Sequence, residues 1–229
     1  PMGWQRSGPT LTDTDMMYIL RRMEKYGLYS EKRVSAAIRI VANENHYHPI
    51  RDYLNDLKWD GTERISHALH RFLGAAEDEL TAEALKIFLL GAIKRVFHPG
   101  CKFEMMLCLV GGQGAGKSSF FRLLAIKDEW FSDDLRRLDD DNVFRKLQGH
   151  WIMEMSEMIA TANAKSIEEI KSFLSKQKET YKIPYETHPA DRLRQCVFAG
   201  TTNRQDFLPR GRRGKRRFRP NRGDATQSE

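Results

Sequence analysis

Cysteine is scarce in this sequence of 229 residues, which contains Cys101, Cys108 and Cys196 and no C-x-x-C pair. An odd number of scattered cysteines does not indicate a disulfide framework. Cys108 and Cys196 lie within apolar runs, so we expect them to be reduced residues of the core. Reduced thiols are typical of the cytoplasm, which is the compartment that we expect for this protein.

Long apolar runs are also missing, and no stretch approaches the length that spans a bilayer. The first residues do not resemble a secretory signal, and we expect residues 1–11 to be a disordered or expression-derived terminus. The sequence therefore predicts no membrane contact. Hydrophobic residues make up 40% and charged residues 30%, which is typical of a globular protein with one substantial or two small domains.

Acidic residues are absent from one short segment, residues 210–222, which carries eight lysines and arginines. Without these eight charges the formal net charge of +7 falls to −1, so the basic character of the chain belongs to this segment. A solubilising tail is one interpretation. An element that contacts the phosphates of nucleic acid or nucleotide is the other, and we favour it.

The first part of the chain, residues 12–104, has the periodicity of helices. Apolar residues recur at helical spacing in five stretches, which we expect to pack against other helices. His46 and His48 have no cysteine or carboxylate at ligand spacing, so we expect no metal site there. The expected cap and turn residues are Thr12 or Asp13, Gly27, Ser30, Pro49, Trp59-Asp60-Gly61, Gly74 and His98-Pro99-Gly100.

The central motif follows this helical region. An apolar run, residues 105–110, predicts a buried strand and leads into Gly111-x-x-x-x-Gly116-Lys117-Ser118, which is the Walker A pattern. Glycines let backbone N–H groups turn toward phosphate oxygens, Lys117 supplies positive charge, and Ser118 places a hydroxyl on Mg²⁺. A chance glycine loop would not explain the strand before it and the apolar helix after it. The expected ATP site comprises Gly111, Gly112, Gln113, Gly114, Ala115, Gly116, Lys117, Ser118 and Ser119.

Two more apolar runs follow, at residues 151–155 and 196–201, with a helix that we expect Ser166 to cap between them. Strands that alternate with helices predict a mostly parallel sheet, in which ligands bind at the carboxyl ends of the strands. The second strand carries Glu154, and Glu157 lies just beyond it.

We assign Glu154 to Mg²⁺ and Glu157 to the attacking water, and an exchange of these roles stays open. A surface acidic pair is the alternative interpretation. Asn203, after the third strand, has an amide that can hydrogen-bond both the γ-phosphate and the water.

Five segments occur in an order that carries a family resemblance. They are Trp59-Asp60-Gly61 with Arg64, the loop of residues 111–118, WIMEMSE at 151–157, GTTN at 200–203 and GKRRF at 214–218. Together they resemble the virulence-associated protein E family, which bacteriophages, prophages and pathogenicity islands encode. That family is similar to superfamily 3 helicases and phage primase-helicases within the AAA+-like ATPases. The resemblance covers residues 45–218.

The resemblance implies an α/β fold, with a parallel sheet flanked by helices in a P-loop ATPase core over residues 105–220. The all-helical region would precede this core, and a polar tail of residues 221–229 would follow it. Asn203 would sense the γ-phosphate. Arg216 or Arg217 would be the arginine finger that reaches the ATP of a neighbouring subunit, which implies a ring, expected to be a hexamer. The loop before these arginines, residues 208–213, lacks the acidic residue that the family commonly has there.

The resemblance also implies a hairpin between the second and third strands that projects into the channel of the ring. Lys176, Lys178 and Lys182, called the hairpin lysines below, would contact the phosphates of single-stranded or forked DNA there. A solvated lysine-rich loop is the alternative interpretation.

These features predict an ATP-hydrolysing, DNA-dependent ring ATPase or helicase of phage or mobile-element replication, with ATP and Mg²⁺ as cofactors, in a bacterial or phage-infected cell. One alternative is a non-catalytic nucleic-acid-binding module that uses ATP as a switch. Another is a small-molecule kinase, but the sequence has no substrate signature for it, and that function would not explain the GTTN segment or the arginine pair.

Overall fold

The computed structural model describes residues 4, 11–135, 138, 143–156, 164–181, 189–203 and 218–223. The chain forms two compact units, which meet between Asp52 and Tyr53 in the sequence. Within the described residues, no helix combines the length and the apolar character needed to cross a membrane.

The first unit contains helix α1 (Asp13–Glu24) and helix α2 (Glu31–Glu44), both at predicted positions. Thr12 begins α1 with a capping box, in which its side chain accepts a hydrogen bond from the backbone N–H of Asp15. The Asp15 carboxylate in turn accepts one from the backbone N–H of Thr12 at 2.9 Å. Ser30 caps α2 with its hydroxyl. These bonds satisfy backbone N–H donors that a helix start leaves unpaired. For this reason, a polar residue before each stretch of helically spaced apolar residues correctly predicted the start of the helix.

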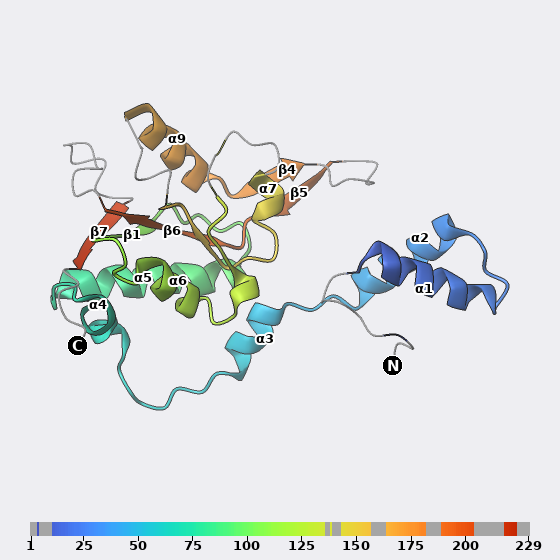
Figure 1. Cartoon of the computed structure of the whole chain (residues 1–229), viewed down its shortest axis with the longest axis horizontal. Helices are drawn as coiled ribbons and strands as arrows, with labels where there is room; N and C mark the ends of the chain where they lie inside the picture. The colour runs from blue at the N-terminus through green and yellow to red at the C-terminus, as the bar shows by residue number, and fades with distance from the viewer. Residues whose placement is uncertain are drawn as a thin grey trace. The chain divides into compact units, whose positions relative to one another are not determined.

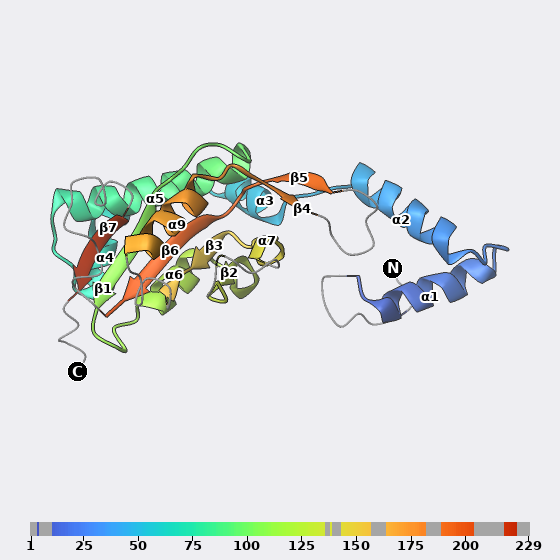
Figure 2. The same cartoon turned by 90° about the horizontal axis from the view of Figure 1, so that it is seen from above.

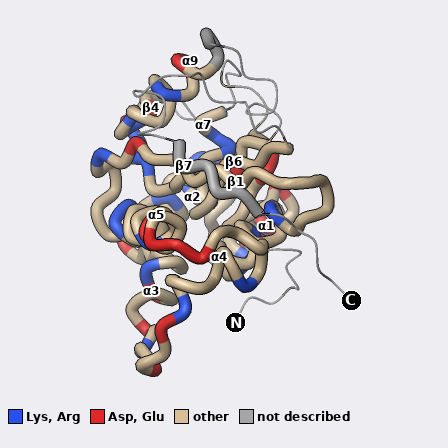
Figure 3. The backbone as a smooth tube through the Cα atoms, turned by 90° about the vertical axis from the view of Figure 1, so that its left-hand side faces the viewer, with Lys and Arg blue, Asp and Glu red and all other residues tan. Residues whose placement is uncertain are grey.

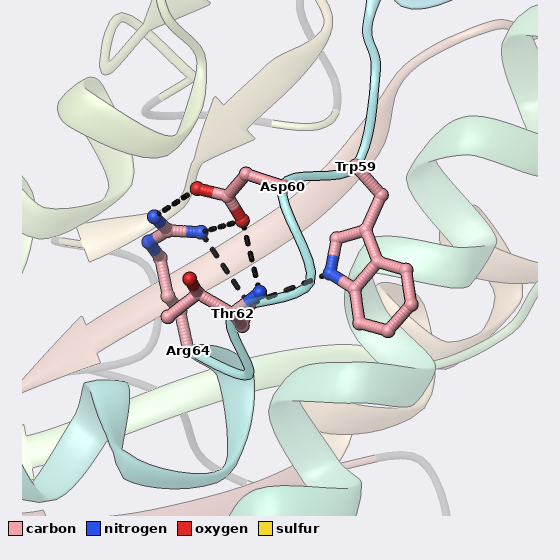
Figure 4. A network of polar contacts seen from close by, with 4 residues as sticks. All are labelled: Trp59, Asp60, Thr62 and Arg64. Atoms are coloured by element: carbon pink, nitrogen blue, oxygen red, sulfur yellow. Dashed lines mark hydrogen bonds and ion pairs between the residues drawn. The ribbon is translucent and has the colours of Figure 1, made fainter.

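The predicted turn between α3 (Pro49–Asp56) and α4 (Ile65–Leu73) is closed by polar contacts (Figure 4). Asp60 accepts a hydrogen bond from the backbone N–H of Thr62 at 3.0 Å. Its two carboxylate oxygens also pair with the two terminal nitrogens of Arg64 at 2.6 and 2.9 Å. The Arg64 contact, followed by the Thr62 bond, lowers the pKa of the Asp60 carboxyl. The turn is therefore a defined structure that leads directly into α4.

Helices α4 and α5 (Glu79–Phe97) pack against each other in the second unit. Helix α4 ends at Gly74, whose φ of 61° favours glycine. Asp78 begins α5 by accepting a hydrogen bond from the backbone N–H of Thr81 at 2.7 Å. The sequence predicted one helical region over residues 12–104 that includes these two helices. In the structure they instead share a compact unit with the sheet.

A five-stranded parallel sheet forms the centre of the second unit (Figures 1 and 2). Its strand order is β2–β3–β6–β1–β7, and every neighbouring pair runs in parallel. The strands are β1 (Met106–Gly111), β2 (Phe131–Ser132), β3 (Ile152–Glu154), β6 (Val197–Thr202) and β7 (Phe218–Gly223). The prediction of a parallel α/β sheet is confirmed. Because β6 lies between β1 and β3, the carboxyl ends of these three strands meet at one edge.

Helices cover both faces of the sheet (Figure 1). On one face, α5 and α6 (Lys117–Leu124) bring the rings of Phe88 and Phe121 to 5.9 Å between centroids. On the other face, α9 (Ala164–Ser175) places Phe173 against Phe198 of β6, with 5.2 Å between ring centroids. The buried cluster on that side also takes in residues of β1, β3 and the short helix α7 (Val143–Lys146). The sheet is therefore enclosed, which explains its apolar strands.

Cys108 and Cys196 belong to this buried cluster, and both are free thiols, as the sequence predicted. Burial raises the pKa of each thiol. Both cysteines therefore act as small apolar residues of the core.

The implied hairpin is present as strands β4 (Lys178–Tyr181) and β5 (Ala190–Leu193), which pair in antiparallel fashion. Strand β4 contains one basic residue, Lys178, and Figure 3 shows basic (blue) backbone at this strand. Arg194, which follows β5, is only 3% exposed and anchors the base of the hairpin. Its guanidinium donates to the backbone carbonyl of Phe173 in α9 at 2.5 Å and pairs with Glu179 of β4.

Some local predictions need correction. Ser166 lies inside α9 and does not cap it, because Ala164 and Lys165 are good helix formers that extend the helix start. The sequence also gave no prediction for β2, which has two residues, or for β7. Strand β7 has no apolar or alternating pattern, and it contains Pro220, which an edge strand tolerates.

Candidate functional site

The glycine-rich loop, residues 111–116, joins β1 to α6 at the carboxyl edge of the sheet. Gly114 and Gly116 adopt φ angles of 81° and 73°, which residues with a Cβ rarely adopt. Gly116 is the N-cap of α6, so the loop passes directly into the helix at Lys117. A Cβ at Gly112, Gly114 or Gly116 would meet no atom within 4 Å, so the space beside the loop is open.

This open space is a pocket of about 430 Å³. The volume lies within the range of roughly 300–1,000 Å³ that is typical of small-molecule sites. The loop and the start of α6 contribute one wall, and the ends of β3 and β6 contribute the other. The lining residues are Gln113, Gly114, Ala115, Gly116, Lys117, Ser118, Ser119, Ser156, Thr201, Thr202 and Asn203.

Lys117 extends from the first turn of α6 back across the loop. Its ammonium donates hydrogen bonds to the carbonyl oxygens of Gly111 at 2.9 Å and Gly112 at 2.5 Å, and to Asn203 Oδ1 at 3.2 Å. Burial lowers the pKa of this ammonium, and the negative charge of Glu154 opposes that shift. The predicted residues Lys117 and Asn203, which are 86 positions apart in the sequence, are therefore in direct contact.

Glu154, at the end of β3, is completely buried beside the start of α6. Its Oε1 atom accepts a hydrogen bond from the Ser118 hydroxyl at 2.7 Å and another from the Thr201 hydroxyl at 2.5 Å. Its Oε2 atom has no hydrogen-bond partner among the described residues. The structure therefore brings together the two residues, Ser118 and Glu154, that the sequence predicted as metal ligands.

The chemistry of this pair fits Mg²⁺. A hydroxyl and a carboxylate are hard oxygen donors, and Mg²⁺ is usually bound by one or two carboxylates together with phosphate oxygens and water. The unpartnered Oε2 atom of Glu154 is a buried acceptor that a cation would satisfy. In the part of the chain that the structure describes, no three His, Cys, Asp or Glu residues gather as a complete protein site for a metal. A bound Mg²⁺ would therefore need ligands from phosphate and water as well.

Four predicted residues lie outside the described residues, namely Glu157, Lys182, Arg216 and Arg217. Lys176 and Lys178 lie at the hairpin and do not line the pocket. Lys178 pairs with Asp191 across the two strands, and its side chain is 56% exposed. Lys176 lies over the Phe144 ring at 5.0 Å and 3.7 Å from a Glu179 oxygen. Both lysines are partly exposed, but each already has an acidic neighbour.

Thr201 also lies at the site, although its position in the sequence does not predict a role. The one available indication was its position two residues before Asn203, which places both on the same face of a strand. The contact with Glu154 became visible only through the pairing of β3 and β6, in which Glu154 aligns with Ala199.

Comparison with known proteins bears on the identity of this fold and site. The profile of the virulence-associated protein E-like domain matches residues 54–227, which is most of the chain. This protein belongs to the virulence-associated protein E-like domain family. The match includes the Trp59 turn, the glycine-rich loop and Glu154, and it confirms the family that the five sequence segments indicated.

No curated protein matches this family member. Among solved structures, two of the NrS-1 C-terminal region are similar, at 15% and 16% sequence identity and TM-scores of 0.49 and 0.47. They cover 70% and 69% of this chain, whereas this chain covers only 37% and 36% of theirs.

Proposed function

We propose that this virulence-associated protein E-like domain hydrolyses ATP, and that single-stranded DNA stimulates the reaction. The observation that best supports this proposal is that three predicted groups line one pocket and a fourth lies directly behind it. Lys117 and Ser118 of α6 and Asn203, which follows β6, line the pocket, and the buried Glu154 of β3 accepts a hydrogen bond from Ser118. A lysine, a hydroxyl, a carboxylate and an amide around a glycine-rich loop are the groups that phosphoryl transfer from a nucleotide requires.

The loop and Lys117 would bind the phosphates. The first N–H groups of α6 have no partners within the helix and carry its positive dipole end, which favours an anion. Lys117 has two carbonyls and the Asn203 amide as hydrogen-bond partners. Because an ammonium bonds more strongly to an anionic phosphate than to a neutral carbonyl, Lys117 would exchange these contacts for phosphate oxygens.

Ser118 and Glu154 would hold Mg²⁺, and the bound ion would neutralise charge on the phosphate oxygens. Glu154 is buried behind Ser118, whereas Glu157 lies three residues further along the chain. This arrangement favours Glu154 for the metal and leaves Glu157 to orient or deprotonate the attacking water. Asn203 would contact the γ-phosphate and hold the attacking water in line with the phosphate bond that breaks.

DNA binding and assembly complete the proposal. The hairpin lysines would bind the phosphates of single-stranded or forked DNA. Arg216 or Arg217 would reach the ATP of the next subunit in a ring, expected to be a hexamer, so that assembly and DNA binding regulate hydrolysis. The likeness of the family to helicases further suggests a role in phage or mobile-element replication.

Phosphate release from ATP, measured with and without single-stranded DNA, tests this function. The expected result is Mg²⁺-dependent release that DNA stimulates and that rises more steeply than linearly with protein concentration. Lys117→Ala should abolish it, and Lys86→Ala is the matched control because Lys86 is an exposed residue of α5 that pairs with Glu83. ATP binding without release would favour the nucleotide switch, and the absence of both would contradict the proposal.

A further inference from the structure

Thr201 lies in the pocket but has no part in the function as described so far. It is 6% exposed, and its hydroxyl donates to Glu154 Oε1 at 2.5 Å. The register of the sheet produces this contact. Glu154 aligns with Ala199 on the neighbouring parallel strand, and Thr201 follows two residues later on the same face.

The two oxygens of Glu154 have different environments. Oε1 accepts hydrogen bonds from both Ser118 and Thr201, while Oε2 has no partner among the described residues. A fully buried carboxylate with one unsatisfied oxygen is unfavourable unless a cation or ordered water completes it. The two hydroxyls therefore fix the orientation of the carboxylate and leave its second oxygen free for a cation.

We propose that Thr201 is a positioning residue that holds Glu154 in the orientation needed for Mg²⁺, an inference that rests on the proposed function. Ser118 donates to the same oxygen and can do so while its lone pairs face a cation, so the two hydroxyls share this role, and Thr201 is the one of the two that is not itself an expected metal ligand. The Thr201 hydroxyl belongs to β6, a strand in the middle of the sheet, and its partner is Glu154 Oε1. Thr201 therefore pre-organises the metal site through Glu154.

Two substitutions at Thr201 separate this role from simple packing. Thr201→Val keeps the shape of the side chain and removes the hydroxyl, whereas Thr201→Ser keeps the hydroxyl and removes a methyl group. Thr81→Val is the matched control, because Thr81 is a buried threonine of α5 that does not line the pocket. Circular dichroism checks folding, and Thr201→Ala replaces Thr201→Val if the valine variant does not fold.

Metal affinity is the main measurement, and it does not require turnover. Mn²⁺ is titrated into the protein in the presence of ADP, and free Mn²⁺ is followed by electron paramagnetic resonance. The affinity for ADP without metal is measured separately in EDTA. Thr201→Val should weaken Mn²⁺ binding by about 10- to 100-fold, which is typical for loss of a hydrogen bond to a metal ligand. Affinity for ADP in EDTA should stay within about twofold, and kcat should fall with the Mn²⁺ affinity. Thr201→Ser and Thr81→Val should behave like the wild type.

Three results would overturn the inference. Wild-type Mn²⁺ affinity in a folded Thr201→Val protein would show that the hydroxyl does not position Glu154. An equal loss in Thr201→Ser would show that packing of the methyl group matters instead. In both cases the wild-type protein would still bind ADP with Mn²⁺, and the proposed function would stand. If the wild-type protein binds no ADP under any condition, the proposed function and the inference fail together.

Discussion

Replacing Glu179 with glutamine should destabilise the second compact unit, because Glu179 neutralises a buried arginine. The side chains of Glu179 and Arg194 are 6% and 1% exposed, and they form an ion pair. Arg194 also lies over the rings of Phe173 and Phe198, with its guanidinium carbon 4.4 and 5.1 Å from their centroids. Glutamine keeps the size of the side chain and one oxygen acceptor but removes the negative charge.

The magnitude follows from the burial of the pair. Removing one partner of a buried ion pair typically costs about 3–5 kcal/mol, because the remaining charge is left in a poorly solvated place. Arg194 keeps its hydrogen bond to the Phe173 carbonyl at 2.5 Å, and glutamine can still accept one. We therefore expect a loss near the lower limit, about 3 kcal/mol.

Urea unfolding followed by tryptophan fluorescence measures this loss, since Trp130 and Trp151 lie in the same unit. Asp191→Asn is the matched control. It breaks the Lys178–Asp191 pair on the same hairpin, but those side chains are 56% and 48% exposed, and solvent screens them. If Glu179→Gln unfolds at the same urea concentration as Asp191→Asn with an unchanged slope, the buried ion pair does not stabilise this unit.

Three further predictions concern the proposed reaction. Glu157→Gln should keep ATP binding and lose turnover by roughly 10²-fold or more, the scale of a general base, and a wild-type rate would place this residue outside the site. Reversing the charge of the hairpin lysines should weaken binding of single-stranded DNA and flatten its salt dependence in fluorescence anisotropy, while an unchanged slope would move the DNA surface elsewhere. Arg216→Ala or Arg217→Ala subunits should regain some hydrolysis when mixed with Lys117→Ala subunits, and no rescue in demonstrably mixed rings would contradict a finger in trans.

Where chemistry restricts the residue type, the sequence predicted local structure well. Thr12 and Ser30 start helices because their side chains satisfy exposed N–H groups, and Gly74 ends one because its φ is positive. The apolar run followed by the glycine-rich loop predicted a strand, a turn and a helix in that order. These are short-range rules, and each depends on a few neighbouring residues.

Long-range contacts were not accessible from the sequence in the same way. Arg95 and Arg194 are 1% and 3% exposed, although arginine is rarely buried, and their partners include carbonyls of residues far along the chain. Strand β7 forms because β1 offers it an edge, which no local pattern reveals. Thr201 lies at the site because β3 pairs with β6, and this pairing of strands far apart in the sequence has no local pattern either.

Isothermal titration of the protein with ATP and Mg²⁺ tests the central claim most directly, because it asks whether the pocket beside the glycine-rich loop binds the nucleotide. The wild-type protein should bind one ATP per chain, and Lys86→Ala should bind it equally well. Lys117→Ala should remain folded by circular dichroism and bind ATP about 10- to 100-fold more weakly, as expected for the loss of charge-assisted hydrogen bonds to phosphate. Equal affinity in wild-type and folded Lys117→Ala protein, or no binding to the wild type, would contradict the assignment of this pocket.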